Sequence, residues 1–274
     1  MLKIAVTGPD GLIGSRIIEL LQNNFYFIPL PFKKFDITKR DQVNQALENL
    51  SFDIFLHLAA YTNVAASETE REKTYQLNVE GTRNVFEAVN KKNKKFIYIS
   101  TDFVFDGRNP PFYEDSVPNP LGYYAKTKYE AEKIVKDAAM IVRLSYPYRN
   151  KFAAKKDYVA SIRTALEAGK KLRMTTDCFI TPTFVDDIAY AFKHLSENYS
   201  SEIFHLVGSQ SLSHNEAGHL IAKNFGLDDS LISPITFKEY FKDISLRPQY
   251  SIIKSKKNNF YKMASFEEGL KKLL

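Results

Sequence analysis

The stretch Lys3-Ile4-Ala5-Val6-Thr7-Gly8-Pro9-Asp10-Gly11-Leu12-Ile13-Gly14 decides the fold of this 274-residue chain. Its first four residues are an apolar strand, and an amphipathic run follows the glycines as far as Asn23. Strand, glycine turn and helix in this order let a pyrophosphate lie against free backbone N–H groups at the positive end of a helix dipole. The spacing is G-x-x-G-x-x-G, with no Gly-Lys-Ser/Thr behind it, so the pattern indicates a dinucleotide site and not a Walker loop.

Each glycine has a separate expected task. Gly8 makes the tight turn, Gly11 allows close approach of the backbone to a ligand, and Gly14 permits close packing of the helix. Three glycines at this spacing also occur in ordinary turns. Their place between a strand and a helix, in a series of such units, favours the nucleotide site.

Composition sets the broad class of the chain. The net charge of +6, from 38 basic and 32 acidic residues, indicates a lysine-rich solvated surface, or attraction of an anionic ligand. We expect no nucleic-acid partner, because the lysines are scattered. The single cysteine, Cys178, excludes an internal disulfide, and we expect no metal site. With neither an apolar run of ~20 residues nor a signal peptide in view, we expect no membrane partner and a cytoplasmic protein.

Apolar runs alternate with helical patterns through the first half of the chain. We expect strands at residues 3–6, 25–30, 54–58, 96–100 and 141–145, separated by helices at residues 12–23, 40–50, 70–90 and 124–136. This alternation predicts an α/β fold with a doubly wound parallel sheet of the NAD(P)-binding Rossmann type. In the second half we expect helices at residues 158–168, 184–195, 214–225 and 265–274, strands at 172–175 and 203–207, and an irregular stretch at 228–257.

The looser second half suggests two interleaved units. We expect a dinucleotide-binding Rossmann domain of residues 1–150, to which residues 183–208 return. The smaller C-terminal substrate lobe then consists of residues 151–182 and 209–274.

The end of the second strand bears on the choice of cofactor. NAD-binding chains place a carboxylate there for the ribose 2′-hydroxyl, but this strand ends in Pro-Leu-Pro and is followed by Lys33 and Lys34. The two lysines favour tolerance of a 2′-phosphate, hence NADP(H), with NAD(H) as the alternative; they are also compatible with a merely solvated surface. Asp36 is expected to cap the next helix or to hold the adenine edge.

A tyrosine and a lysine lie four residues apart in Tyr124-Ala125-Lys126-Thr127-Lys128, and on a helix they share one face. An ammonium about 4 Å from a phenol lowers its pKa by up to roughly three units, which makes a competent acid near neutrality. Tyr129 with Lys133 has the same spacing, so position must decide. Tyr124 follows the strand that ends in Thr101, and ligands bind beyond such strand ends.

These motifs resemble a known family. The glycine turn, Ser100-Thr101-Asp102 and Tyr124-x-x-x-Lys128 together resemble extended short-chain dehydrogenases/reductases. More narrowly, residues 58–62 (Leu-Ala-Ala-Tyr-Thr) and 100–107 (Ser-Thr-Asp-Phe-Val-Phe-Asp-Gly) are similar to stretches of the dTDP-4-dehydrorhamnose reductases. Thr181-Pro182-Thr183 and Arg247-Pro248 match signatures in the later lobe.

The resemblance implies an NADP-dependent oxidoreductase that reduces the 4-keto group of a nucleoside-diphosphate 6-deoxysugar, as in dTDP-L-rhamnose biosynthesis. The implied catalytic residues are Thr101 on the substrate carbonyl, Tyr124 as proton donor and Lys128 on the nicotinamide ribose. The implied cofactor contacts are Gly8, Gly11, Leu12, Ile13, Gly14, Lys33, Asp36, Ile37, Ala59, Ala60, Tyr61, Thr62 and Lys128. The implied substrate contacts are Thr101, Phe103, Tyr146 and Arg247. A homodimer is also expected from relatives.

Three positions depart from the family pattern. Ala65 stands where an aspartate is usual, Tyr146 where a tryptophan is frequent, and Ile180 where a glycine precedes Thr-Pro-Thr. These changes leave hydride transfer intact and bear on the choice of sugar nucleotide. Two other functions remain open from the sequence. One is an epimerase or dehydratase that retains NAD; the other is a non-catalytic NADP-binding regulatory subunit like that of methionine adenosyltransferase.

Overall fold

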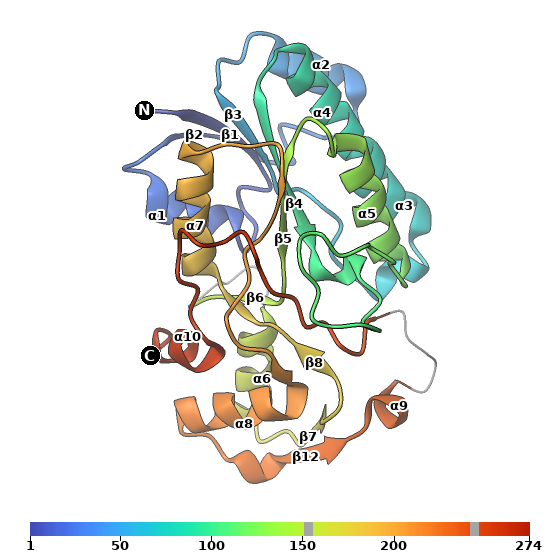
Figure 1. Ribbon diagram of the computed structural model, residues 1–274, viewed down its shortest axis with the longest axis vertical. Helices are drawn as coiled ribbons and strands as arrows, with labels where there is room; N and C mark the ends of the chain where they lie inside the picture. Colours follow the sequence, from blue (N-terminus) through green and yellow to red (C-terminus); the bar gives the residue numbers. More distant parts are fainter. Residues whose placement is uncertain (151–155, 242–246) are drawn as a thin grey trace.

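The computed structural model describes residues 1–150, 156–241 and 247–274. Its centre is a six-stranded sheet, in the order β10-β5-β4-β3-β1-β2, whose neighbouring strands all run parallel (Figure 1). The strands are β1 (Lys3–Thr7), β2 (Tyr26–Leu30), β3 (Ile54–His57), β4 (Lys95–Thr101), β5 (Met140–Leu144) and β10 (Ile203–His205). The α/β fold with a doubly wound parallel sheet is therefore confirmed.

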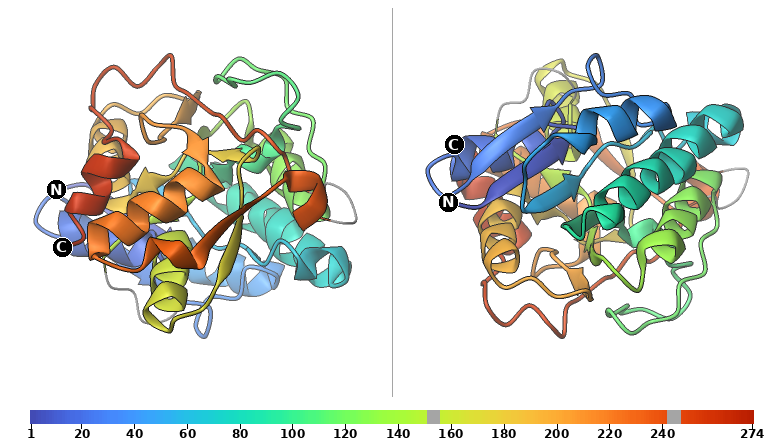
Figure 2. Two further views of the ribbon diagram at one scale, coloured as in Figure 1. Left: turned by 90° about the horizontal axis from the view of Figure 1, so that it is seen from below. Right: turned by 90° about the horizontal axis from the view of Figure 1, so that it is seen from above.

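Helices cover both faces of this sheet (Figure 2). The helices α1 (Gly14–Leu21) and α7 (Val185–Glu197) pack against each other on one face, and α2 (Arg40–Glu48), α4 (Gly81–Lys91) and α5 (Tyr123–Val135) lie on the other. Alternate residues of β4 feed the two cores, as a strand requires. Ile97 and Ile99 join the core under α1 and α7, while Phe96 and Tyr98 join the other core.

The helix expected at residues 70–90 consists of three pieces. They are α3 (Arg71–Tyr75), a π-helical turn at Gln76–Glu80 and α4. The wider turn carries Asn78, which is buried and hydrogen-bonded to two other segments. Such contacts compensate for the poorer geometry of a π-turn, and they come from residues far away in the sequence, so the local helical pattern does not reveal them.

The remaining elements surround the lower end of the sheet in Figure 1. They are β6 (Pro147–Tyr148), α6 (Tyr158–Glu167), β7 (Leu172–Thr175), β8 (Phe179–Ile180), β9 (Thr183–Phe184), β11 (Leu212–Ser213), α8 (His214–Phe225), β12 (Ile232–Ile235), α9 (Phe237–Tyr240) and α10 (Phe266–Lys271), with 3₁₀ turns at Ala66–Glu68, Asp102–Val104 and Asp229–Leu231. A third core cluster lies among α6, α8 and α10. The bounds of the two expected domains remain a prediction.

The expectation of an irregular stretch at residues 228–257 is wrong for its first part. Residues 232–235 form β12, which pairs in parallel with β7. Pro234 hides this strand in the sequence, because proline cannot donate to a sheet ladder. It is tolerated here since β12 is an edge of a two-stranded sheet and Pro234 itself is exposed. Residues 242–246 of that stretch lie outside the described residues.

Candidate active site

A cavity of about 640 Å³ lies beyond the carboxyl ends of β1, β3, β4 and β5. Such an edge of an open parallel sheet is where ligands bind. The expected site residues that line the cavity are Gly8, Gly11, Leu12, Ile13, Gly14, Ala59, Ala60, Thr62, Thr101, Phe103, Tyr124, Lys128, Tyr146 and Arg247. The structure therefore brings the glycine turn, the tyrosine–lysine pair and all four expected substrate residues to one cavity.

Lys33 and Asp36 are not among the residues that line this cavity. Lys33 is exposed on the surface. The Asp36 carboxylate accepts hydrogen bonds from the N–H and the hydroxyl of Thr38, at 3.0 and 2.8 Å, which makes a local turn. The N-cap residue of α2 is Lys39, so the alternative that Asp36 caps the next helix is wrong. The cofactor contacts of Lys33 and Asp36 stay predictions.

Ile37 and Tyr61 also lie outside the cavity lining. Ile37 is 2% exposed and packs so closely on Gly81 that a Cβ there would lie 2.7 Å from its side chain. The Lys73 ammonium lies 4.8 Å from the centroid of the Tyr61 ring. Any cofactor contact of these two residues thus remains a prediction, and the structure gives both side chains another neighbour.

The glycine turn has the shape of a backbone cradle. Gly8 has φ +66°, in the left-handed region, and a Cβ on it would lie 3.1 Å from the Ala59 nitrogen. A Cβ on Gly14 would lie 2.4 Å from the Gly8 carbonyl oxygen. Within the described residues no side chain caps the start of α1. Open backbone at a helix N-terminus suits a phosphate group, so these residues fit the pyrophosphate of a dinucleotide.

A buried histidine holds the ends of β1 and β3 together. The Thr7 hydroxyl accepts hydrogen bonds from the N–H groups of Leu58 and Ala59, at 3.2 and 3.3 Å, and therefore donates to His57 Nδ1, 2.8 Å away. Burial, and then the charge of Lys128, lower the pKa of His57 to about 3, so the imidazole is neutral. His57 supports the cavity wall from within the core.

Tyr124 and Lys128 are both buried, and they line the same cavity as the glycine turn. Burial and the nearby Asp102 carboxylate raise the pKa of Tyr124, so the expectation that Lys128 lowers it is wrong for this structure. The Lys128 ammonium instead donates to the Ile99 carbonyl oxygen at 2.8 Å and lies 4.2 Å from the centroid of the Tyr98 ring. A phenol with a raised pKa keeps its proton at neutral pH.

Lys128 has an unusual ionisation of its own. Burial lowers its pKa to about 7, while the charge of Glu132, one helical turn further along α5, opposes this. Glu132 forms a bidentate ion pair with Arg143 of β5, at 2.9 and 2.7 Å, and both side chains are nearly inaccessible. An ion pair under the lysine thus belongs to the support of the site.

An aromatic cluster packs beside Tyr124, with the Phe103 ring edge to face at 6.2 Å from the Tyr124 ring. Tyr146 packs at 6.1 Å from Phe103 and, edge to face, at 5.5 Å from Tyr158 of α6. The Tyr158 hydroxyl lies 2.9 Å from Nδ1 of His214, whose pKa burial lowers to about 4. Arg247 is the cationic residue among the expected substrate contacts that line the cavity. Aromatic faces beside a cation suit a sugar and a phosphate.

Several lining residues escaped the sequence analysis. Ser100 and Asp102 flank Thr101 in a quoted motif, which was a usable signal. Lys156, Asp157 and Tyr158 also line the cavity, but they lie at the start of α6 and carry no motif. Ser100 is notable because its hydroxyl is buried with no hydrogen-bond partner among the described residues. A buried orphan hydroxyl at a cavity wall is compatible with a bound polar ligand.

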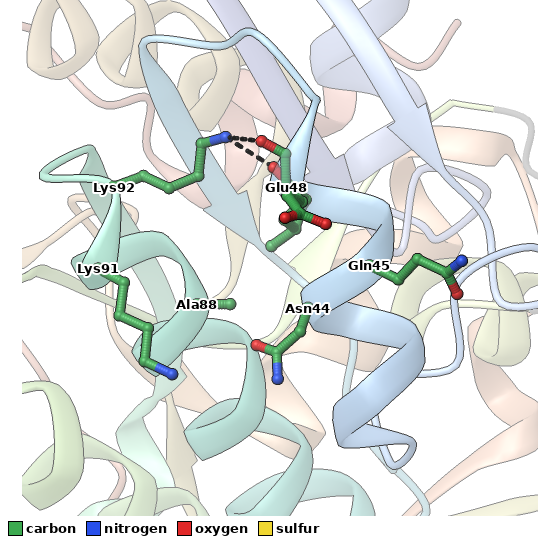
Figure 3. Close-up of a pocket in the computed structure, with 7 residues that line it drawn as sticks. Asn44, Gln45, Glu48, Ala88, Lys91 and Lys92 are labelled. Atoms are coloured by element: carbon green, nitrogen blue, oxygen red, sulfur yellow. Dashed lines mark hydrogen bonds between the residues drawn. The ribbon is translucent and has the colours of Figure 1, made fainter.

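A second hollow lies between α2 and α4, as Figure 3 shows. Lys92 reaches across it and donates to the carbonyl oxygens of Leu47 and Glu48, at 2.8 and 2.6 Å. These contacts satisfy the open C-terminal carbonyls of α2. None of the expected site residues lines this hollow. The contacts of Lys92 stabilise the end of α2.

We also searched the described residues for metal-binding clusters and for helices that could cross a membrane, because either would bear on the class of protein. Over the described ranges, we find no group of three or more His, Cys, Asp or Glu side chains arranged to hold a metal ion. No helix in the described part of the chain is long and apolar enough to span a bilayer.

A doubly wound sheet, a glycine turn and a buried Tyr-x-x-x-Lys pair on one cavity define an extended short-chain dehydrogenase/reductase. The chain belongs to the dTDP-4-dehydrorhamnose reductase family, since the family model described as "RmlD substrate binding domain" matches residues 2–274. It is 30% identical to methionine adenosyltransferase 2 subunit beta of Bos taurus, over 85% of this chain and 75% of the relative. It is 29% identical to a dTDP-4-dehydrorhamnose reductase of Aggregatibacter actinomycetemcomitans, over 72% and 68%.

A solved structure agrees with this family. The crystal structure of dTDP-4-dehydrorhamnose reductase from Bacillus anthracis, in complex with NADP, has a TM-score of 0.92 to this chain. The two sequences are 30% identical, and the match covers 99% of this chain and 98% of that one.

Proposed function

We propose that this protein is an NADPH-dependent reductase of the 4-keto group of a nucleoside-diphosphate 6-deoxysugar, with dTDP-4-dehydrorhamnose as the first substrate to test. One observation carries the proposal most directly. The open glycine turn and the buried Tyr124 and Lys128 line one and the same cavity. Relatives named dTDP-4-dehydrorhamnose reductase, one of them solved with NADP, support the same activity.

The residues present fit the expected cofactor. Gly8, Gly11 and Gly14 would hold its pyrophosphate against the start of α1, and Lys128 would hold its nicotinamide ribose. When bound, the cofactor supplies a hydride to the keto carbon. NADPH is preferred in this proposal because the strand β2 ends without a carboxylate for the ribose 2′-hydroxyl.

Tyr124 is the proton donor in this proposal. Reduction of a ketone needs one proton on the oxygen, and a general acid must still hold that proton when the hydride arrives. Burial and Asp102 raise the pKa of Tyr124, which keeps the phenol protonated before the reaction. Lys128 then stabilises the phenolate that remains, because it lies one helical turn away on the same face of α5.

The substrate end is assigned to the aromatic cluster and Arg247. Phe103 and Tyr146 would contact the sugar, and Arg247 the diphosphate. The expected homodimer, the cytoplasmic location and the absence of nucleic-acid or membrane partners remain predictions. The three departures at Ala65, Tyr146 and Ile180 bear on which sugar nucleotide is accepted.

Tyr124→Phe tests the assignment of the acid. We expect turnover to fall by about 100-fold or more, because a positioned acid contributes roughly that factor, while NADPH binding is retained. Tyr129→Phe is the matched control: Tyr129 lies on the same helix with a lysine four residues on, and packs in another cluster. Its turnover should stay within about twofold of the parent. Undiminished turnover in Tyr124→Phe would exclude the proposed acid.

A non-catalytic regulatory subunit is the second candidate. The 30% identity with methionine adenosyltransferase 2 subunit beta favours it. The buried, protonated Tyr124 beside Thr101 and Lys128 favours catalysis. A pull-down with a methionine adenosyltransferase catalytic subunit, together with the reductase assay, separates the two. Binding without reduction of any keto sugar supports the regulatory subunit.

A further inference from the structure

Arg149 is a nearly buried cation that has no part in the proposed mechanism. It directly follows β6, and its side chain is only 8% exposed. Burial of a guanidinium group is costly unless acceptors surround it. The acceptors around Arg149 therefore indicate what it does.

The Arg149 side chain reaches the start of α1. Its Nη1 donates to the Ser15 hydroxyl oxygen at 3.0 Å and to the Leu12 carbonyl oxygen at 3.4 Å, and its Nη2 pairs with Glu19 at 3.1 Å. The Ser15 hydroxyl donates its own proton to the Gly11 carbonyl oxygen at 2.8 Å. Arg149 thus holds two carbonyl oxygens of the glycine turn, one directly and one through Ser15.

These two carbonyl oxygens fix the directions of two N–H groups. A trans peptide unit is planar, so its C=O and its N–H point in opposite directions. The units whose carbonyl oxygens belong to Gly11 and Leu12 contain the N–H groups of Leu12 and Ile13. Neither N–H group has a hydrogen-bond acceptor among the described residues, and both residues line the cavity. Open N–H groups at the start of a helix are the donors that a pyrophosphate needs.

The backbone of Arg149 is held at the start of α6. Its N–H donates to Asp157 Oδ2 at 3.1 Å, while Oδ1 of the same carboxylate caps α6 by accepting from the Ala160 N–H at 2.9 Å. Asp157 and Tyr158 line the cavity, and Tyr158 packs on Tyr146. Arg149 therefore joins the start of α1 to the segment that bears the aromatic cluster.

We propose that Arg149 is a positioning residue for the cofactor: it holds the carbonyl oxygens of Gly11 and Leu12 and so keeps the N–H groups of the glycine turn directed at the pyrophosphate. Arg149 acts through the turn, since it lies outside the residues that line the cavity. This inference rests on the cofactor of the proposed function but not on the reduction, so cofactor binding tests it without turnover.

Arg149→Met removes every donor of the side chain and keeps an unbranched stem. We expect the NADPH dissociation constant, measured by isothermal titration, to rise about tenfold, which is the worth of one hydrogen bond from a charged group. In a Ser15→Ala background, Arg149→Met should raise it by less than about threefold, because the oxygen through which Arg149 acts is already gone. An equal rise in both backgrounds would overturn the proposal.

Ser15→Ala keeps the proposal testable even where Arg149→Met does not fold, because alanine favours a helix. Alone it should raise the NADPH dissociation constant by about threefold or more. An unchanged NADPH affinity in Ser15→Ala would also overturn the proposal.

Arg16→Met is the matched control. Arg16 lies on α1, pairs with Glu19 as Arg149 does, and binds Asp186 of α7 at 2.7 and 2.6 Å. Its loss removes the same charge and a bidentate ion pair, but not a hydrogen bond to a carbonyl oxygen of the turn. We expect an NADPH dissociation constant within about twofold of the parent. A rise as large as that of Arg149→Met would show a general effect of charge or stability and overturn the proposal.

Titration at high salt separates positioning from plain attraction of the anionic cofactor. Charges are screened over about 3 Å at 1 M salt. We expect the ratio of the Arg149→Met and parent dissociation constants at 1 M NaCl to stay within about twofold of its value at 0.1 M. A ratio that falls to one would overturn the proposal. If the parent binds NADPH but reduces no keto sugar, the proposed function fails, and these affinities still decide the role of Arg149.

Discussion

At the scale of a residue, Lys128 has the most unusual environment in the site. Its ammonium is held by one carbonyl oxygen and an aromatic face, with only 4% of the residue exposed. Burial penalises the charged form and lowers its pKa to about 7. The positive charge of Lys128 therefore destabilises the fold. In the proposed reaction the same charge stabilises the Tyr124 phenolate.

This cost predicts a pH-dependent stability. The unfolded lysine has a pKa of about 10.4 and binds its proton more readily than the folded one, so the penalty is full below about pH 7 and vanishes as the pH rises towards 10. Lys128→Met should be more stable than the parent near pH 7, by roughly 1–3 kcal/mol, and the gain should shrink near pH 9.5. Chemical denaturation at both pH values measures this; a gain equal at both would contradict it.

At the scale of an element, the strand–turn–helix unit depends on glycine for two different reasons. Gly8 needs a positive φ and also lies against the backbone of the segment after β3. Gly226 has nearly the same φ, +63°, at the end of α8, but a Cβ on it would have no heavy atom within 4 Å. A comparison of Gly8 with Gly226 therefore distinguishes the effect of backbone strain, which both positions share, from the effect of crowding at the glycine turn, which only Gly8 has.

Gly8→Ala and Gly226→Ala form a matched test of the cradle. Both should lose roughly 1 kcal/mol of stability, because both force alanine into the left-handed region. Only Gly8→Ala should weaken NADPH binding, by about tenfold or more, since its Cβ pushes on the cavity wall. Isothermal titration with NADPH measures the difference. Equal affinities in the two variants would show that the turn does not hold the cofactor.

At the scale of the whole molecule, one buried network ties the sheet, α5 and the C-terminal segment together. Glu132 pairs with Arg143, and Arg143 Nη1 lies 3.4 Å from His205 Nε2 of β10. His205 Nδ1 in turn lies 2.8 Å from the Lys254 carbonyl oxygen. Glu132 lies one helical turn from Lys128 on α5 and interacts with its charge, so the network joins the stability of the fold to the site.

Glu132→Ala should destabilise the protein by about 3–5 kcal/mol, because it leaves the Arg143 guanidinium buried without its counter-charge. Glu130→Ala is the control on the same helix: Glu130 pairs with Lys133, and the two side chains are 45% and 50% exposed. Its loss should cost less than about 1 kcal/mol. Thermal and denaturant unfolding of the two variants compare them. Similar losses of unfolding free energy in the two variants would mean that the buried Glu132–Arg143 pair matters no more to stability than the exposed Glu130–Lys133 pair.

The features of this molecule that depend on local sequence pattern could be predicted from the sequence. The first five strands, the turn at Gly8 and the helix with Tyr124 follow from apolar runs and glycine spacing, and the structure has them within a few residues. Features that depend on contacts with residues far away in the sequence could not be predicted. The π-turn at Asn78, the strand around Pro234 and the wall at Tyr158 are stabilised by contacts across the fold.

The ionisation of the site shows the same limit. Helical spacing placed Tyr124 and Lys128 on one face, but it said nothing of burial, and burial dominates both pKa values. The resemblance supplied residue roles that the cavity partly supports. It did not reveal that the Asp102 carboxylate accepts hydrogen bonds from Ser145 and Ser251, because these two residues come from other segments of the chain.

The most direct measurement is NADPH oxidation with a panel of nucleoside-diphosphate 4-keto-6-deoxysugars, with dTDP-4-dehydrorhamnose first. We expect the parent protein to consume one NADPH per sugar and to form a product heavier by two hydrogen atoms, and we expect Tyr124→Phe to form it about 100-fold or more slowly. NADPH that binds but is consumed with no member of the panel would contradict the reductase.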